Sequence, residues 1–161
     1  MILGITGHRP PTLGGYKTPN PTYDAVREAI KAKFEELKPE KIISGMATGT
    51  DQWAAEIAIE LGIPFIAALP CQNQDAKWPP KGQQVFKEIL AKADEVVLVH
   101  DGPYTSDCMH KRDQWVVDHC DELLAVWNGQ EFGGTFATVR MAEKAKRVIH
   151  KINPEELKNE V

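Results

Sequence analysis

The sequence contains little cysteine and no long apolar run. Its three cysteines, Cys71, Cys108 and Cys120, are odd in number and widely spaced, which is not a disulfide framework and suits a reducing compartment. No apolar stretch approaches the roughly 20 residues that a membrane-spanning helix needs. The first residues already have the pattern of a strand, so we expect no signal peptide. These absences predict a cytoplasmic protein with no membrane partner.

An excess of positive charge is also lacking. The chain has 19 lysines and arginines against 23 aspartates and glutamates, which gives a net charge of −4. Proteins that bind a nucleic-acid backbone usually carry a basic face, and this balance gives no sign of one. Local basic segments are still compatible with the composition. Nucleic acid is therefore a disfavoured partner, although it is not excluded.

The spacings typical of metal sites are missing as well. Cys108 and His110, together with His119 and Cys120, lack a CxxC, HxxxH or HExxH arrangement. Buried thiols and histidines on a helix face are the simpler interpretation. We expect neither a metal ion nor a resident cofactor.

What the sequence does contain is a regular alternation of strands and helices. With 161 residues, 42% of them hydrophobic, it suits a single domain over residues 1–161. Short apolar runs followed by segments of helical spacing predict βαβ units, and hence a three-layer Rossmann-like α/β fold with a mostly parallel sheet. The expected strands are 2–6, 41–44, 64–69, 95–100, 123–127 and 148–152, and the expected helices are 21–38, 51–61, 83–93, 109–119 and 135–145, before a charged tail.

In such a sheet a ligand lies beyond the carboxyl ends of the strands, near the point where the strand order reverses. The loop after the second expected strand runs directly into a helix. Its glycines allow a close approach to a ligand, and the helix start offers free amides. Asp51 suits a helix cap or a ribose hydroxyl better than a phosphate, and a turn without a ligand is the alternative. The candidate residues here are Ser44, Gly45, Thr48, Gly49, Thr50 and Asp51.

A second glycine loop follows the fifth expected strand and again leads into a helix. Gly133, Gly134 and Thr135 stand where backbone amides can hold an anion at the start of that helix. Two such loops at one edge of a sheet indicate a phosphate site more specifically than either loop alone.

Charged and aromatic residues in other loops at this edge are further candidates. The loop after the first expected strand begins at Thr6 and Gly7. In it, Arg9 can pair with a phosphate, and His8 can hydrogen-bond to a base or a sugar. Alternatively, both are solvent-exposed loop residues. Lys111 and Arg112 lie near a helix start, where positive charge is unfavourable, which indicates a use such as clamping an anion; a solvated basic turn is the alternative. Trp78 either lines the site or packs its own loop, whereas Trp53, Trp115 and Trp127 are expected in the core.

These motifs resemble the SLOG superfamily, a Rossmann-like group that joins DNA-processing protein A and the "lonely guy" phosphoribohydrolases. Residues 44–51 resemble the SG-x-A-x-G-x-D motif of the DNA-processing proteins. Residues 109–112 resemble the M-H-x-R segment of the phosphoribohydrolases, and residues 133–135 resemble their glycine turn. Over almost its whole length the chain most resembles the small YpsA-like branch.

One departure from the phosphoribohydrolase pattern affects the functional prediction. Those enzymes follow the glycine turn with a glutamate that works with the motif arginine, whereas here no carboxylate precedes Glu143. The resemblance makes Arg112 a candidate catalytic residue without its partner, although Asp51 or Glu56 could substitute. We therefore expect a sensing or binding domain for a nucleotide or NAD-derived phosphate, with an N-glycosidase acting on nucleoside monophosphates and a single-stranded DNA binder as alternatives. Related folds pair helices across a dimer face, so a homo-oligomer is compatible with the sequence.

Overall fold

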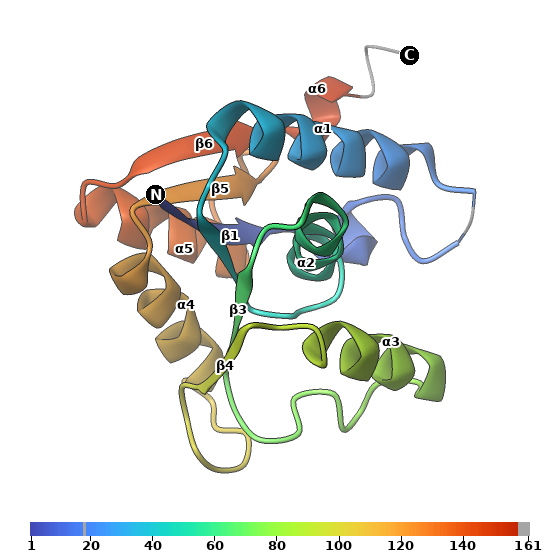
Figure 1. Cartoon of the computed structure of the whole chain (residues 1–161), viewed down its shortest axis with the longest axis vertical. Helices are drawn as coiled ribbons and strands as arrows, with labels where there is room; N and C mark the ends of the chain where they lie inside the picture. Colours follow the sequence, from blue (N-terminus) through green and yellow to red (C-terminus); the bar gives the residue numbers. More distant parts are fainter. Residues whose placement is uncertain (18, 158–161) are drawn as a thin grey trace.

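The structure is a computed structural model, and it describes residues 1–17 and 19–157. Six strands form one sheet in the order β4-β3-β2-β1-β5-β6, and every neighbouring pair is parallel (Figure 1). The strands are β1 (Ile2–Gly7), β2 (Lys41–Ser44), β3 (Phe65–Leu69), β4 (Glu95–Leu98), β5 (Glu122–Val126) and β6 (Val148–Ile152). The predicted Rossmann-like α/β fold is confirmed.

Helices cover both faces of this sheet. One face carries α1 (Pro21–Leu37), α2 (Thr50–Leu61) and α3 (Pro80–Leu90), and the other carries α4 (Cys108–His119) and α5 (Gly133–Lys144) (Figure 1). The alternation of strand side chains divides the core accordingly: Ile42 packs on the α1 and α2 side, and its neighbour Ile43 packs against α4. A 3-10 turn at Pro10–Thr12 follows β1.

Local sequence explains where these helices begin and end. Asn20 caps α1 by accepting a hydrogen bond from the Tyr23 amide at 3.2 Å, and Pro21 supplies the first helical residue, which is where the expected helix 21–38 begins. Helix α3 begins at Pro80, three residues before the predicted start, because a proline is favoured in the first turn. Helix α5 begins at Gly133, two residues before the prediction.

The end of the chain differs from the expected charged tail. Residues Pro154–Leu157 form a short helix, α6, which packs on α1. Among the described residues, no helix combines the length and apolar character that a membrane span requires.

Candidate functional site

The strand order reverses between β1 and β5, and a hollow of about 340 Å³ lies at that point. The loops after β1, β2 and β5 contribute to its wall together with the first turns of α4. These segments are far apart in the sequence, and the parallel sheet brings their ends to one edge. The predicted site residues that line the hollow are Thr6, Gly7, His8, Arg9, Asp51, Arg112, Gly134 and Thr135.

The start of α5 leaves its first amides open to this hollow. Gly133 has a φ of 90°, a conformation that favours glycine, and the preceding Phe132 provides no side-chain cap. A Cβ added at Gly134 would meet nothing within 4 Å. The first N–H groups of a helix have no partner within the helix and carry a partial positive charge. Gly134 and Thr135 therefore offer uncapped donors at the wall of the hollow.

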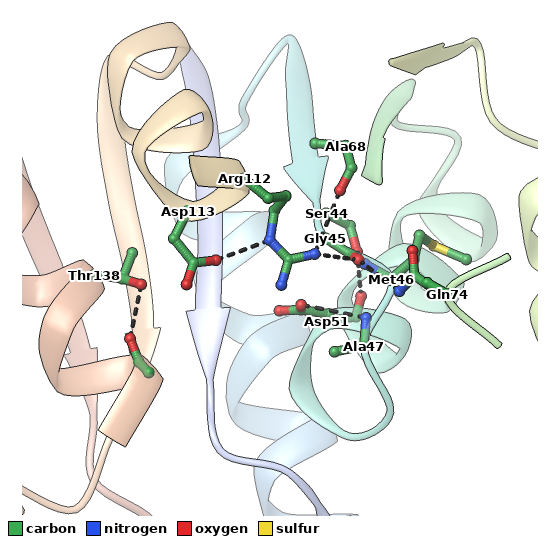
Figure 2. Close-up of polar contacts among 11 residues, drawn as sticks. Ser44, Gly45, Met46, Ala47, Asp51, Ala68, Gln74, Arg112, Asp113 and Thr138 are labelled. Atoms are coloured by element: carbon green, nitrogen blue, oxygen red, sulfur yellow. Dashed lines mark hydrogen bonds and ion pairs between the residues drawn. The ribbon is translucent and has the colours of Figure 1, made fainter. Parts of the chain in front are cut away.

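The glycine loop after β2 is arranged differently, because its polar groups bond to one another. The Ser44 hydroxyl donates to the Asp51 carbonyl at 2.7 Å and accepts from the Met46 amide at 3.1 Å (Figure 2). The Thr50 hydroxyl donates to the His8 carbonyl at 3.0 Å. The hydroxyl of the candidate residue Thr50 is thus already bonded within the protein. Ser44, Gly45, Thr48, Gly49 and Thr50, and Gly133 of the other loop, do not line the hollow.

Asp51 is not the cap of α2 that the sequence suggested. Gly49 occupies the cap position, and the Asp51 carboxylate instead accepts from the Ala47 amide at 3.4 Å. This carboxyl is 8% exposed and lines the hollow. Burial raises its pKa from 3.8 to about 6, and the nearby positive charge of Arg112 opposes that rise. Both protonation states of Asp51 are therefore accessible near neutral pH.

Arg112 is buried behind the β2 loop and is held by three acceptors. Its Nη1 donates to the Gly45 carbonyl at 2.6 Å and to the Ala68 carbonyl at 3.4 Å, and its Nε donates to Asp113 at 2.8 Å. The remaining nitrogen, Nη2, points toward Asp51 (Figure 2) and has no hydrogen-bond partner within residues 1–17 and 19–157. Nη1 and Nε of this guanidinium are thus used in contacts within the protein, and only Nη2 is left for a ligand.

Asp113 is the site residue that sequence reasoning missed. Its carboxylate lines the hollow and forms the ion pair with Arg112 described above. The phosphoribohydrolase pattern places a carboxylate downstream of the glycine turn, whereas this one directly follows the motif arginine. Its position next to Arg112 in the sequence was the available signal. A carboxylate partner for Arg112 is therefore supplied by α4 itself.

His8 joins three segments of the site and is 4% exposed. Its Nε2 accepts from the Asn128 amide at 3.0 Å, so that nitrogen is unprotonated. Burial lowers the pKa of His8, which also favours the neutral ring. Its carbonyl receives the Thr50 amide and hydroxyl. Since Nε2 is occupied, only Nδ1 is available for the predicted contact with a base or sugar.

Arg9, unlike the buried His8, is exposed, and its side chain has no hydrogen-bond partner within the described part of the chain. It lines the same hollow as the start of α5. The predicted charge partner of a phosphate is therefore open to a ligand. Lys111, by contrast, pairs with Asp107 at 3.1 Å on the exposed face of α4.

Metal-ligating residues do not gather at this site. Within the described residues, no three histidine, cysteine, aspartate or glutamate side chains converge in a way that could hold an ion. Cys71, Cys108 and Cys120 are buried free thiols. The chemistry available at the hollow includes backbone amides, two carboxylates, two guanidinium groups, the His8 imidazole and the hydroxyl and amide side chains of Thr6, Thr12, Thr135 and Gln130.

A parallel sheet with a hollow at its switch point defines a Rossmann-like α/β protein. The chain belongs to the YspA SLOG family, whose model matches residues 3–157. A relative named "UPF0398 protein" from Bacillus thuringiensis (strain Al Hakam) is 26% identical over 152 residues, which cover 89% of this chain and 83% of the relative.

Two solved structures share the fold. DNA processing protein A from Streptococcus pneumoniae has a TM-score of 0.66 and 19% identity, and the match covers 94% of this chain and 50% of that one, so this chain spans half its length. DNA processing protein A from Helicobacter pylori has a TM-score of 0.68 and 20% identity, and the match covers 95% of this chain and 65% of that one. The Helicobacter pylori protein is known for a single-stranded DNA binding mode.

Proposed function

We propose that this protein is a cytoplasmic binding domain for a nucleotide or a nucleotide-derived phosphate. The observation that carries the proposal is the uncapped start of α5, where Gly134 and Thr135 line the hollow together with the exposed Arg9. An anion there would receive backbone N–H groups, the positive end of the helix and one guanidinium.

The rest of the hollow suits the sugar of such a ligand. Asp51 and Asp113 belong to α2 and α4 rather than to α5, and both line the cavity. A carboxylate repels phosphate but accepts hydrogen bonds from ribose hydroxyls. The hollow therefore combines donors for a phosphate at the start of α5 with carboxylate acceptors for a sugar on α2 and α4.

A charge placed at Gly134 tests this proposal. Gly134→Asp should abolish binding of AMP and of ribose 5-phosphate in isothermal titration calorimetry, because the new carboxylate stands where the phosphate would lie. Gly134→Asn is the matched control, since it adds the same bulk without charge into open space. Aspartate in the first turn of a helix stabilises the helix, so unfolding would not explain a loss of binding. Unchanged affinity in Gly134→Asp, or no binding by the parent protein, would contradict the proposal.

A specific observation also supports a second function, hydrolysis of an N-glycosidic bond. Arg112 has a carboxylate partner in Asp113, and Asp51 has a pKa raised to about 6, as a general acid requires. Incubation with AMP followed by chromatography for free adenine tests it. Release that disappears in Asp113→Asn would establish the enzyme, and no release over many hours would exclude it for this substrate.

Single-stranded DNA carries the same phosphates and bases as a free nucleotide. The net charge of −4 and the presence of two carboxylates in the hollow favour the small ligand. A fluorescent oligothymidylate provides the comparison. Salt-sensitive binding of the oligonucleotide, with no competition by AMP, would favour the DNA-binding interpretation instead.

A further inference from the structure

A second hollow of about 500 Å³ adjoins the first, on the side of β3 and β4. The loops after these two strands form most of its wall, which includes Trp78 and Tyr104. The two hollows share Arg9, Ala47 and Met109 as lining residues. The two hollows therefore adjoin along these residues, and a ligand in the first can extend toward the second.

The character of the second hollow differs from that of the first. Its exposed wall is more apolar, and two aromatic rings contribute to it. The Trp78 ring is held edge-to-face against Phe86, with centroids 5.3 Å apart and an interplanar angle of 85°. Tyr104 is 68% exposed, and its ring contacts no other aromatic ring among the described residues. Flat surfaces of this kind suit a planar ring.

Gln74 adds a specific polar signal to this wall. Its Nε2 donates to the Gly45 carbonyl at 3.2 Å, and that carbonyl also accepts from Arg112 (Figure 2). Because a carbonyl only accepts, the amide nitrogen must face it, and Oε1 is left on the other side. Gln74 Oε1 is buried and has no hydrogen-bond partner among the described residues. Gln74 lines the second hollow and the terminal torsion of glutamine is soft, so a donor on a ligand that reaches Oε1 would satisfy this buried acceptor.

We propose that the second hollow binds the heterocycle of the ligand whose phosphate lies at the start of α5. This inference rests on the proposed function and names the ligand class: a nucleotide whose base carries an exocyclic N–H donor. The base stacks between Trp78 and Tyr104 and donates to Gln74 Oε1. The ribose then lies between the phosphate and the base, beside Asp51 and the shared lining residue Met109.

Three probes separate the contributions of base and phosphate. Ribose 5-phosphate has no base, AMP has a base with an amino group, and IMP has an oxo group in place of that amino group. In calorimetric titrations we expect AMP to bind at least about tenfold more tightly than ribose 5-phosphate, which is the usual size of one base-stacking contribution. IMP should bind more weakly than AMP, because it lacks the exocyclic amino group that donates to Gln74 in AMP.

Two variants test the aromatic wall, and the readout is the ratio of the AMP affinity to the ribose 5-phosphate affinity. Tyr104→Ala and Trp78→Ala should each lower this ratio, by up to about tenfold. Tyr104 is the safer variant because its ring is largely exposed, so the test survives if Trp78→Ala fails to fold. Tyr16→Ala is the matched control: Tyr16 is 69% exposed and lines neither hollow.

The outcomes distinguish this inference from the proposed function. Equal affinities for AMP and ribose 5-phosphate, or an unchanged ratio in Tyr104→Ala, would overturn the inference and leave a phosphate site. IMP binding as tightly as AMP would overturn the role of Gln74. If neither AMP nor ribose 5-phosphate binds, the proposed function itself fails.

Discussion

Burial determines the ionisation of Asp51, and this has a consequence for stability. Its pKa is raised to about 6 in the folded protein, whereas the unfolded chain has the ordinary value of 3.8. Between these pH values the folded state binds more protons than the unfolded state. The contribution of Asp51 to stability is therefore greatest at low pH and is lost as the pH rises through about 6.

The Asp51→Asn variant isolates this effect. We expect the unfolding free energy of the parent, measured relative to Asp51→Asn by urea denaturation, to fall by up to about 3 kcal/mol between pH 4 and pH 8. Asparagine does not titrate, so the difference in unfolding free energy cancels the contributions of the other titrating groups, which both proteins share. A difference that stays constant over this range would show that Asp51 titrates normally in the folded protein.

Single residues also show the limits of sequence reasoning. The uncapped glycine turn at Gly134 could be predicted, because a strand, a glycine pair and a helix start are local features. The role of Arg112 could not, since its acceptors are carbonyls of Gly45 and Ala68, which are far away in the sequence. Asp113 stands next to Arg112 in the sequence, but only the fold shows that both residues line the hollow.

Among the elements, the two glycine loops have different physical roles. The β2 loop is closed by its own hydrogen bonds and by the guanidinium of Arg112, whereas the start of α5 is open. From sequence the two are equivalent, because each is a strand, a glycine pair and a helix. Side-chain contacts across the sheet edge make the difference.

Alanine at the two glycines should show this contrast. A Cβ at Gly45 would overlap the Arg112 guanidinium and displace its hydrogen bonds, so Gly45→Ala should destabilise the protein by about 1–3 kcal/mol. Gly134→Ala is the control, because its Cβ meets open space and alanine favours a helix. We expect its unfolding free energy to be unchanged or raised by up to about 1 kcal/mol.

Chemical denaturation at pH 7 provides both values. If Gly45→Ala is as stable as the parent, Arg112 does not depend on close contact with the β2 loop. If Gly134→Ala is strongly destabilised, the start of α5 is not open in the way described.

For the whole molecule, the order of strands locates the site. The alternation of apolar runs and amphipathic helices was enough to predict a parallel α/β sheet, because both patterns are local. It was not enough to place β5 beside β1, which is a choice of topology. That choice brings the Arg9 loop and the start of α5 together at the first hollow.

The measurement that tests the central claim most directly is a titration of the ¹⁵N-labelled protein with AMP, followed by amide chemical shifts. The account predicts the largest changes at Gly134 and Thr135, with further changes in the loop that holds Arg9. Shift changes confined to the β2 loop, or to residues outside both hollows, would contradict a phosphate site at the start of α5.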